Sequence, residues 1–395
     1  MTLQQMQDIL GIDKIPAPFE AIYHTVKDTF LDRAGHILSS EFIRRVIRES
    51  GAMLPYEDLI LDAAAELREN SAAKLLICLL EKWVLDLDGY QSGDYTPPSG
   101  SSLGFDFLHL FAALPTIPGS VAHLRSRGVP EDVIASTMKE YDFCIELRRN
   151  LTGRPAFDFS RLNWMRWTIH NKLIIVGNLK FDFFRERAPR EACLYENASG
   201  KQILLANNVW VHSSGGILES AGLTDDKGSF YAAIEETENT ITGYPVCEGV
   251  IQLEKVSLSS AQWKCVLGEN DPIVCVHIPF GAGLDHDLVA KSYQQAREIF
   301  TKCYPDLTYK GFYTHTWLLS PQLRDHLKTT SNILAFQNDY MLFPCKSKGQ
   351  FVFSFVFGGR PENLQDLPEN SSLQRSLKKL YLDGGFIHEY CGVFL

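Results

Sequence analysis

Apolar residues in the first 150 positions recur at the spacing of amphipathic helices. One stripe consists of Leu59, Ile60, Ala63 and Leu67, and another of Val133, Ile134, Met138, Tyr141 and Ile145. Residues three and four positions apart share one face of a helix, so each stripe needs a partner surface. We therefore expect residues 1–150 to form an all-helical N-terminal domain.

After position 150 the pattern changes to the alternation typical of β-strands. β-Branched and aromatic residues dominate the runs 173–176, 179–184, 202–212, 230–234 and 250–253. Runs of this length and composition favour strands with a buried face. We expect residues 151–395 to form a second domain, a mixed β-sheet flanked by helices, which makes the fold class α+β.

The segment 272–357 predicts a strand, a helix and a second strand, followed by a hairpin. The first strand, 273–278, is apolar on both faces except for His277, and a helix over 287–303 leads to the second strand, 312–318. Ser320 and Pro321 then suit the start of a short helix. The runs 333–343 and 351–357 alternate like two antiparallel strands, and a last amphipathic helix carries Leu373, Leu377 and Leu380.

A glycine-containing turn joins the first of these strands to its helix. It comprises Ile278, Pro279, Gly281, Ala282 and Gly283. Backbone N–H groups that precede a helix at the positive end of its dipole suit a pyrophosphate. The same glycines also fit a simple tight turn, with Asp285 and Asp287 capping the helix and repelling an anion.

Composition and charge limit the kinds of partner that this protein is expected to bind. The formal charge of −10 and the absence of long Lys/Arg runs argue against nucleic acid. The nine cysteines form no C-x-x-C pair, and the N-terminus has no basic stretch followed by an apolar core, so we expect a cytoplasmic protein with reduced thiols. The strongest apolar run, 75–80, is far shorter than the roughly 20 residues that span a bilayer, so no membrane partner is expected.

Several stretches resemble a bacterial family of predicted acyltransferases, which pairs a helical N-acyltransferase N-terminal domain with a GNAT-like C-terminal domain. The resemblance is carried by 277–279, 281–297, 315–323, 128–133, 173–181, Asn332, Ile333, Phe336 and Gln337. It implies a GNAT-like sheet in the second domain. It also implies acyl-CoA as a co-substrate, held at Ile278, Pro279, Gly281, Ala282 and Gly283, with no permanently bound cofactor.

The resemblance suggests which side chains would carry the chemistry. Parallel neighbouring strands would bring His277 and His315 close together, and either imidazole would serve as general base for an amine or hydroxyl acceptor. Tyr313 or Tyr340 would protonate the leaving thiolate. For each histidine, a buried ring bonded to a backbone carbonyl is the alternative.

Trp317 and Gln337 complete the predicted site as substrate-binding residues. Packing in the core is the alternative for Trp317, and a structural amide is the alternative for Gln337. The acceptor would be a small-molecule or peptide amine.

Two other functions stay open at this point. One is a non-catalytic ligand-binding or sensor protein with a GNAT-like fold, because Ile278 stands where a typical GNAT loop has Arg or Gln. The other is a metal-dependent hydrolase with His277, His286, Asp287 and His315 as ligands. No H-E-x-x-H or Cys/His spacing supports the hydrolase, so no metal ligands are predicted.

Overall fold

The computed structural model describes residues 1–86, 93, 95–183, 187–279, 281 and 283–395. The chain divides into two compact units. The first comprises residues 1–176 and 302–304, and the second comprises 177–301 and 305–395. This division lies later than the expected change at 150, because an additional helix, α11 (Phe159–Ile169), belongs to the first unit.

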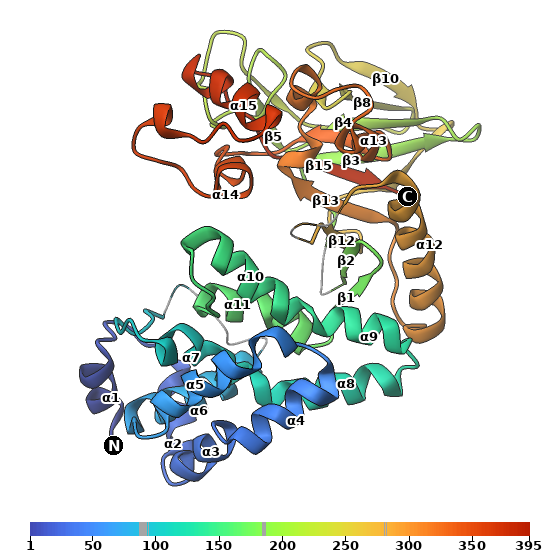
Figure 1. Ribbon diagram of the computed structural model, residues 1–395. Helices are drawn as coiled ribbons and strands as arrows, with labels where there is room; N and C mark the ends of the chain where they lie inside the picture. The colour runs from blue at the N-terminus through green and yellow to red at the C-terminus, as the bar shows by residue number, and fades with distance from the viewer. Residues whose placement is uncertain (87–92, 94, 184–186, 280, 282) are drawn as a thin grey trace. The chain divides into compact units, whose positions relative to one another are not determined.

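The first unit consists of helices followed by a strand near residue 176, and the helices agree with the apolar stripes (Figure 1). Its helices are α1 (Leu3–Leu10), α2 (Pro18–Val26), α3 (Phe30–Ile37), α4 (Ser40–Ser50), α5 (Glu57–Leu67), α6 (Ser71–Val84), α7 (Leu103–Ala113), α8 (Ile117–Ser126), α9 (Glu131–Met138), α10 (Glu140–Thr152) and α11, followed by strand β1 (Leu173–Val176). Side-chain caps begin several of them: Ser39 accepts a hydrogen bond from the Phe42 N–H, and Asn70 from the Ala73 N–H.

One stretch of the first unit, Leu103–Ser126, is long and apolar enough to cross a membrane by length and composition. Of its most apolar 18-residue window, 72% is buried inside the protein. The stretch is also divided into α7, a 3₁₀ turn (Leu114–Thr116) and α8, with Pro115 and Pro118 at the junction. These are the properties of a helix pair at the centre of a helical core.

The second unit contains a mixed sheet with the strand order β2-β12-β13-β15-β14. These strands are β2 (Leu179–Asp182), β12 (Val274–His277), β13 (Phe312–Thr316), β14 (Met341–Pro344) and β15 (Tyr390–Phe394). β12 and β13 are parallel, whereas β2 with β12, β13 with β15, and β14 with β15 are antiparallel. The sheet and its helices confirm the expected α+β class, a helical first domain followed by a domain with a mixed sheet.

Helix α12 (His286–Cys303) makes the crossover between the parallel strands and covers one face of this sheet (Figure 1). Tyr293 on α12 lies with its ring centroid 4.9 Å from that of Phe312 on β13 and 5.2 Å from that of Phe394 on β15. Phe181 on β2 contacts the same helix at Phe300. Because side chains alternate along a strand, this packing defines which residues face the helix.

A second, antiparallel sheet in the same unit has the order β10-β8-β4-β3-β11, with β7 and β9 paired to β8. Its strands are β3 (Ala192–Asn197), β4 (Gln202–Ala206), β7 (Glu235–Glu236), β8 (Thr240–Cys247), β9 (Val250–Ile251), β10 (Val256–Ser259) and β11 (Trp263–Leu267), and a separate pair is formed by β5 (Val209–Val211) and β6 (Phe230–Ala232). Leu194, Leu204 and Val246 share one hydrophobic core with Cys391 and Val393 of β15. The second sheet therefore packs on the mixed sheet's other face.

The predicted hairpin of 333–343 and 351–357 is wrong. The first run is helix α13 (Asn332–Asn338) followed by β14, and the second is helix α14 (Phe351–Phe357). Ser331 caps α13 by accepting a hydrogen bond from the Ile333 N–H. The last helix, α15 (Ser372–Leu382), is present as expected and begins with a capping box at Ser371.

Candidate active site at the end of the parallel strands

The parallel strands β12 and β13 separate before they end. Their ladder consists of the pairs Val274–Phe312 and Cys275–Tyr313. Beyond this point β12 stays paired with β2 through His277, and β13 stays paired with β15 through Thr316. We call the separation beyond Cys275 and Tyr313 the strand fork.

The two predicted histidines stand on either side of the strand fork. His277 and His315 are each two residues beyond the last ladder pair, so they lie level with one another on neighbouring strands. The His277 side chain is 30% exposed, whereas His315 is an exposed residue. Their placement on one sheet face confirms the expected parallel arrangement; their chemical roles stay a prediction.

Carboxylates flank this histidine pair on both sides. His277 Nε2 lies 3.7 Å from Oδ2 of Asp182, a buried residue of β2. Glu389, also buried, precedes β15 on the side of His315. Desolvation by the surrounding protein lowers the pKa of His315 below its ordinary value, Glu389 opposes this shift, and the charge of His277 adds to it. A lowered pKa favours the neutral imidazole that a general base requires.

Sequence reasoning missed Asp182, Lys180 and Glu389. Lys180 and Asp182 are only 6% and 2% exposed, although both are charged residues of a buried strand. Charged residues at alternate positions of an otherwise apolar run are a signal that the sequence does contain. Glu389 carries no comparable signal, because only the pairing of β13 with β15 brings it near His315.

The two predicted tyrosines lie on opposite faces of the sheet. Tyr313 is on the histidine face, where its hydroxyl lies 3.1 Å from Cys391 Sγ, and burial raises its pKa above the ordinary value. Tyr340 packs against Gly392 and Phe394, on the face covered by α12, and its hydroxyl bonds to that of Tyr293. The structure therefore brings Tyr313, and not Tyr340, to the face of the histidines.

Trp317 and Gln337 lie in packed surroundings. Trp317 is 9% exposed and belongs to a hydrophobic core with Leu323, Phe353 and Leu377. Gln337 is 1% exposed, and its Nε2 donates hydrogen bonds of 2.9 Å to the carbonyl oxygens of Leu318 and Ser320. These contacts agree with the structural alternatives for both residues.

The glycine turn follows His277 directly. Ile278 is half-buried, Pro279 is buried, and Gly281 and Gly283 are exposed; Ala282 lies outside the described residues. Gly281 has φ +76°, a conformation that favours glycine. Asn178 Nδ2 donates a 2.9 Å hydrogen bond to the Gly283 carbonyl, which ties the turn to the loop before β2.

The aspartate that was expected to compete for this turn bonds further along the chain. Asp285 Oδ1 accepts a 3.2 Å hydrogen bond from the Leu288 N–H. That N–H belongs to the first turn of α12 and not to the turn at 281–283. The cap and a ligand at the glycines would therefore use different donors.

Metal ligation has little support in the part of the chain that the structure describes. No group of three or more His, Cys, Asp or Glu side chains there is arranged to hold a metal ion. His286, one of the residues considered for this role, lies 3.4 Å from Asp339 and is exposed.

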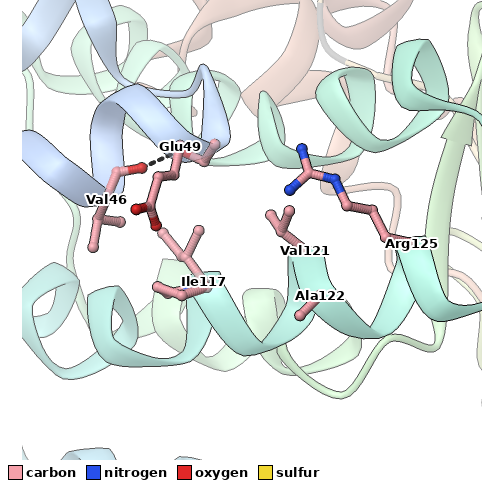
Figure 2. A pocket seen from close by; sticks show the side chains of 8 residues that line it. Val46, Glu49, Ile117, Val121, Ala122 and Arg125 are labelled. Atoms are coloured by element: carbon pink, nitrogen blue, oxygen red, sulfur yellow. Dashed lines mark hydrogen bonds between the residues drawn. The ribbon is translucent and has the colours of Figure 1, made fainter.

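A small pocket also occurs in the helical unit, between α4 and α8 (Figure 2). Val46, Ile117 and Val121 form its apolar wall, and Glu49 and Arg125 contribute the charges. Arg125 is already engaged in two hydrogen bonds with Glu131, at 2.7 and 2.9 Å. The pocket contains none of the predicted site residues.

Comparisons with known proteins agree with this architecture. A search of curated proteins finds no match. Among solved structures, an acyltransferase in complex with decanoyl-CoA and teicoplanin has a TM-score of 0.64 at 16% identity, and an acyltransferase mutant in complex with octanoyl-CoA has a TM-score of 0.63 at 17% identity. Each comparison covers 100% of this chain and 99% of the other. At these identities the likeness concerns the fold.

Family models match both parts of the chain. Residues 54–171 match the N-acyltransferase N-terminal domain, and residues 173–394, more than half of the chain, match the GNAT-like C-terminal domain. The protein therefore belongs to the family with a GNAT-like C-terminal domain, here preceded by an N-acyltransferase N-terminal domain.

Proposed function

We propose that this protein transfers an acyl group from acyl-CoA directly to an amine or hydroxyl acceptor at the strand fork. One observation carries the proposal: β12 and β13 stop pairing where His277 and His315 stand, and a glycine turn leads from this point into α12. The coenzyme would reach the histidines between the two strands, with its phosphates at the turn.

The turn has features that suit the phosphates of a coenzyme. Gly281 and Gly283 are exposed, and the space where a Cβ would lie at either residue is open. The helix that follows, α12, is 18 residues long, and its N-terminus carries partial positive charge. Ser292 accepts a 3.0 Å hydrogen bond from the Asn178 N–H, so α12 helps to hold the loop that supports the turn.

The reaction requires a base and a proton donor on the same side of the sheet. The acceptor nitrogen would attack the thioester carbonyl carbon, and His277 or His315 would take its proton. The C–S bond would then break with its electron pair on sulfur. Tyr313, the predicted tyrosine on this face, would protonate the thiolate and recover its proton from the imidazolium; Tyr340 lies on the other face.

The solved acyltransferases that share this fold suggest which compounds to test first. They were crystallised with decanoyl-CoA, octanoyl-CoA or CoA, and two of them also with teicoplanin or 10C-teicoplanin. Octanoyl-CoA, decanoyl-CoA and teicoplanin therefore head the panel, followed by small amines and peptides. We also propose a cytoplasmic location, which the nine free cysteines support.

Thermal unfolding with and without coenzyme tests the proposal. Octanoyl-CoA at 100 times its dissociation constant should stabilise the protein by about 2.7 kcal/mol, and transfer to an acceptor should release free thiol. Absence of any shift would contradict the proposal. A shift without transfer to any acceptor would favour the ligand-binding protein, and an activity abolished by a chelator would favour the hydrolase.

A further inference from the structure

Glu389 stands diagonally across from His315 on the histidine face of the sheet. β13 and β15 run antiparallel, with His315 opposite Cys391 and Thr316 opposite Tyr390. Glu389 directly precedes β15, and the alternation of side chains continued from Cys391 would place its side chain on the same face. Diagonal neighbours of this kind have Cβ atoms roughly 7 Å apart, within reach of a long side chain.

The loop after β14 holds the Glu389 side chain in place. The Ser347 hydroxyl donates a hydrogen bond to Glu389 Oε2, and the Phe351 N–H donates one of 3.4 Å to Oε1. Ser347 Oγ also accepts a 2.9 Å hydrogen bond from the Glu389 N–H. Glu389 and Ser347 are 3% and 1% exposed, so this carboxylate is fixed in the interior.

A buried carboxylate is costly without a compensating charge. Within the described ranges, no Lys, Arg or His nitrogen forms an ion pair with Glu389 at 4.0 Å or less, whereas His315 lies within range of its electrostatic field. A positive charge that formed on His315 during a reaction would supply that compensation.

The two histidines differ in access. His277 is the more buried ring, and its Nε2 faces Asp182 at 3.7 Å. His315 is exposed beside the strand fork. A base has to reach the acceptor, so exposure favours His315 over His277.

We infer that His315 is the general base of the proposed transfer, and that Glu389 is a positioning residue that stabilises the imidazolium once His315 has taken the acceptor's proton. This inference rests on the proposed function and assigns a role that the proposal leaves open between two histidines. The proton moves from the attacking nitrogen to His315 Nε2 or Nδ1, while the electron pair of the broken C–S bond leaves with the sulfur.

The charged neighbours of His315 give the inference a directional test. The titratable groups on this face are Lys180 and Asp182 on β2, Cys275 and His277 on β12, Tyr313 on β13, Cys391 on β15, and Glu389. Glu389 raises the pKa of His315, and His277 lowers it. Removing Glu389 should therefore lower the pKa of His315, and removing His277 should raise it.

The experiment is the pH profile of kcat/KM for octanoyl-CoA with the full chain. His315→Gln should reduce the rate by about 100-fold or more. Glu389→Gln should shift the acidic limb to lower pH and His277→Gln to higher pH, with acyl-CoA binding retained in both. Glu219→Gln removes an exposed carboxylate paired with Lys346 and should leave the profile unchanged. His315 pKa values from NMR titration should follow the same order.

Each other outcome overturns the inference in a recognisable way. A dead His277→Gln with an active His315→Gln would assign the base to His277 and leave the transferase intact. An unmoved acidic limb and an unmoved His315 titration in Glu389→Gln would reduce Glu389 to a structural residue. A wild-type chain that binds acyl-CoA without transferring it to any acceptor would remove the proposed function and this inference together.

Discussion

Thr314 Oγ1 donates a 2.7 Å hydrogen bond to the carbonyl oxygen of Val276. The bond lies one residue beyond the last ladder pair, Cys275–Tyr313, so a side chain takes over where the backbone pairing of β12 and β13 ends. Thr314 is 1% exposed and faces α12, on the side opposite the histidines. The Thr314 hydroxyl thus provides a hydrogen-bond donor for the Val276 carbonyl, the first carbonyl of β12 within the strand fork.

Substitution of Thr314 should reveal how much this bond stabilises the second unit. Thr314→Val keeps the shape of the side chain but leaves the buried Val276 carbonyl without this donor, which should cost about 1–3 kcal/mol. Thr314→Ser keeps the hydroxyl and should lose less. Urea unfolding of both variants measures the difference, and equal stabilities would show that the hydroxyl is not needed at the fork.

Gly281 and Gly283 offer a matched pair at the glycine turn. Neither has a heavy atom within 4 Å of the point that a Cβ would occupy, but only Gly281 has a positive φ, +76°. Gly281→Ala should therefore strain the turn by about 1 kcal/mol, whereas Gly283→Ala should not. Calorimetric titration with CoA should show weaker binding for Gly281→Ala. Equal affinities of the two variants for CoA would show that coenzyme binding does not depend on the conformation of the turn.

Gln337 should matter for stability and not for substrate affinity. Gln337→Leu removes the donors to the half-buried Leu318 carbonyl and the buried Ser320 carbonyl, and should cost about 2–3 kcal/mol. Asn338→Ala, at the exposed neighbouring position, should stay within about 0.5 kcal/mol of wild type. A raised KM with unchanged stability in Gln337→Leu would instead support the predicted substrate contact.

His109 should make the helical unit sensitive to acid. Burial lowers the pKa of His109 to about 4, and its Nε2 lies 3.2 Å from the Tyr95 hydroxyl. The unfolded chain takes up this proton near the ordinary value of about 6.5, so between that pH and 4 the unfolded state binds more protons and stability falls as pH falls.

The size of this effect follows from the two pKa values. The loss attributable to His109 should approach about 3 kcal/mol at pH 4 and below. His109→Gln should show a flatter dependence of unfolding free energy on pH over this range, and substitution of the exposed His24 should not. The same slope in wild type and His109→Gln would contradict the assigned burial.

The strand–helix–strand unit of the second domain could be predicted from local pattern. Its first strand, β12, is an apolar run except for His277, as expected for a strand covered on both faces, and its helix has one apolar face. The positions of His277 and His315 followed from that unit alone, because parallel neighbours joined by one crossover place their ends together.

Helix α14 shows where local pattern fails. Its sequence, FVFSFVF, alternates like a strand, yet Val352, Phe353 and Phe357 are buried while Phe351 and Phe355 are about half exposed. That is the spacing of a helix, and the buried side chains pack with Leu377 and Tyr381 of α15. Tertiary packing has overridden the strand preference of phenylalanine and valine.

The carboxylates beside the histidines could not be predicted from the sequence, for a different reason. Asp182 and Glu389 are 207 residues apart in sequence, and strand pairing alone brings each of them to its histidine. No spacing rule connects such positions, because the second sheet is inserted between β2 and β12. The same pairing separates Tyr340 from Tyr313, which the sequence could not distinguish.

Hydrogen exchange of the full chain, with and without saturating octanoyl-CoA, tests most directly whether the coenzyme binds at the strand fork. With octanoyl-CoA we expect slower exchange in peptides covering 274–284 and 312–317. With CoA alone we expect the same slowing in the peptide that contains the glycine turn. Protection confined to other segments, or exchange unchanged at saturating coenzyme, would contradict the assignment of the active site to β12 and β13.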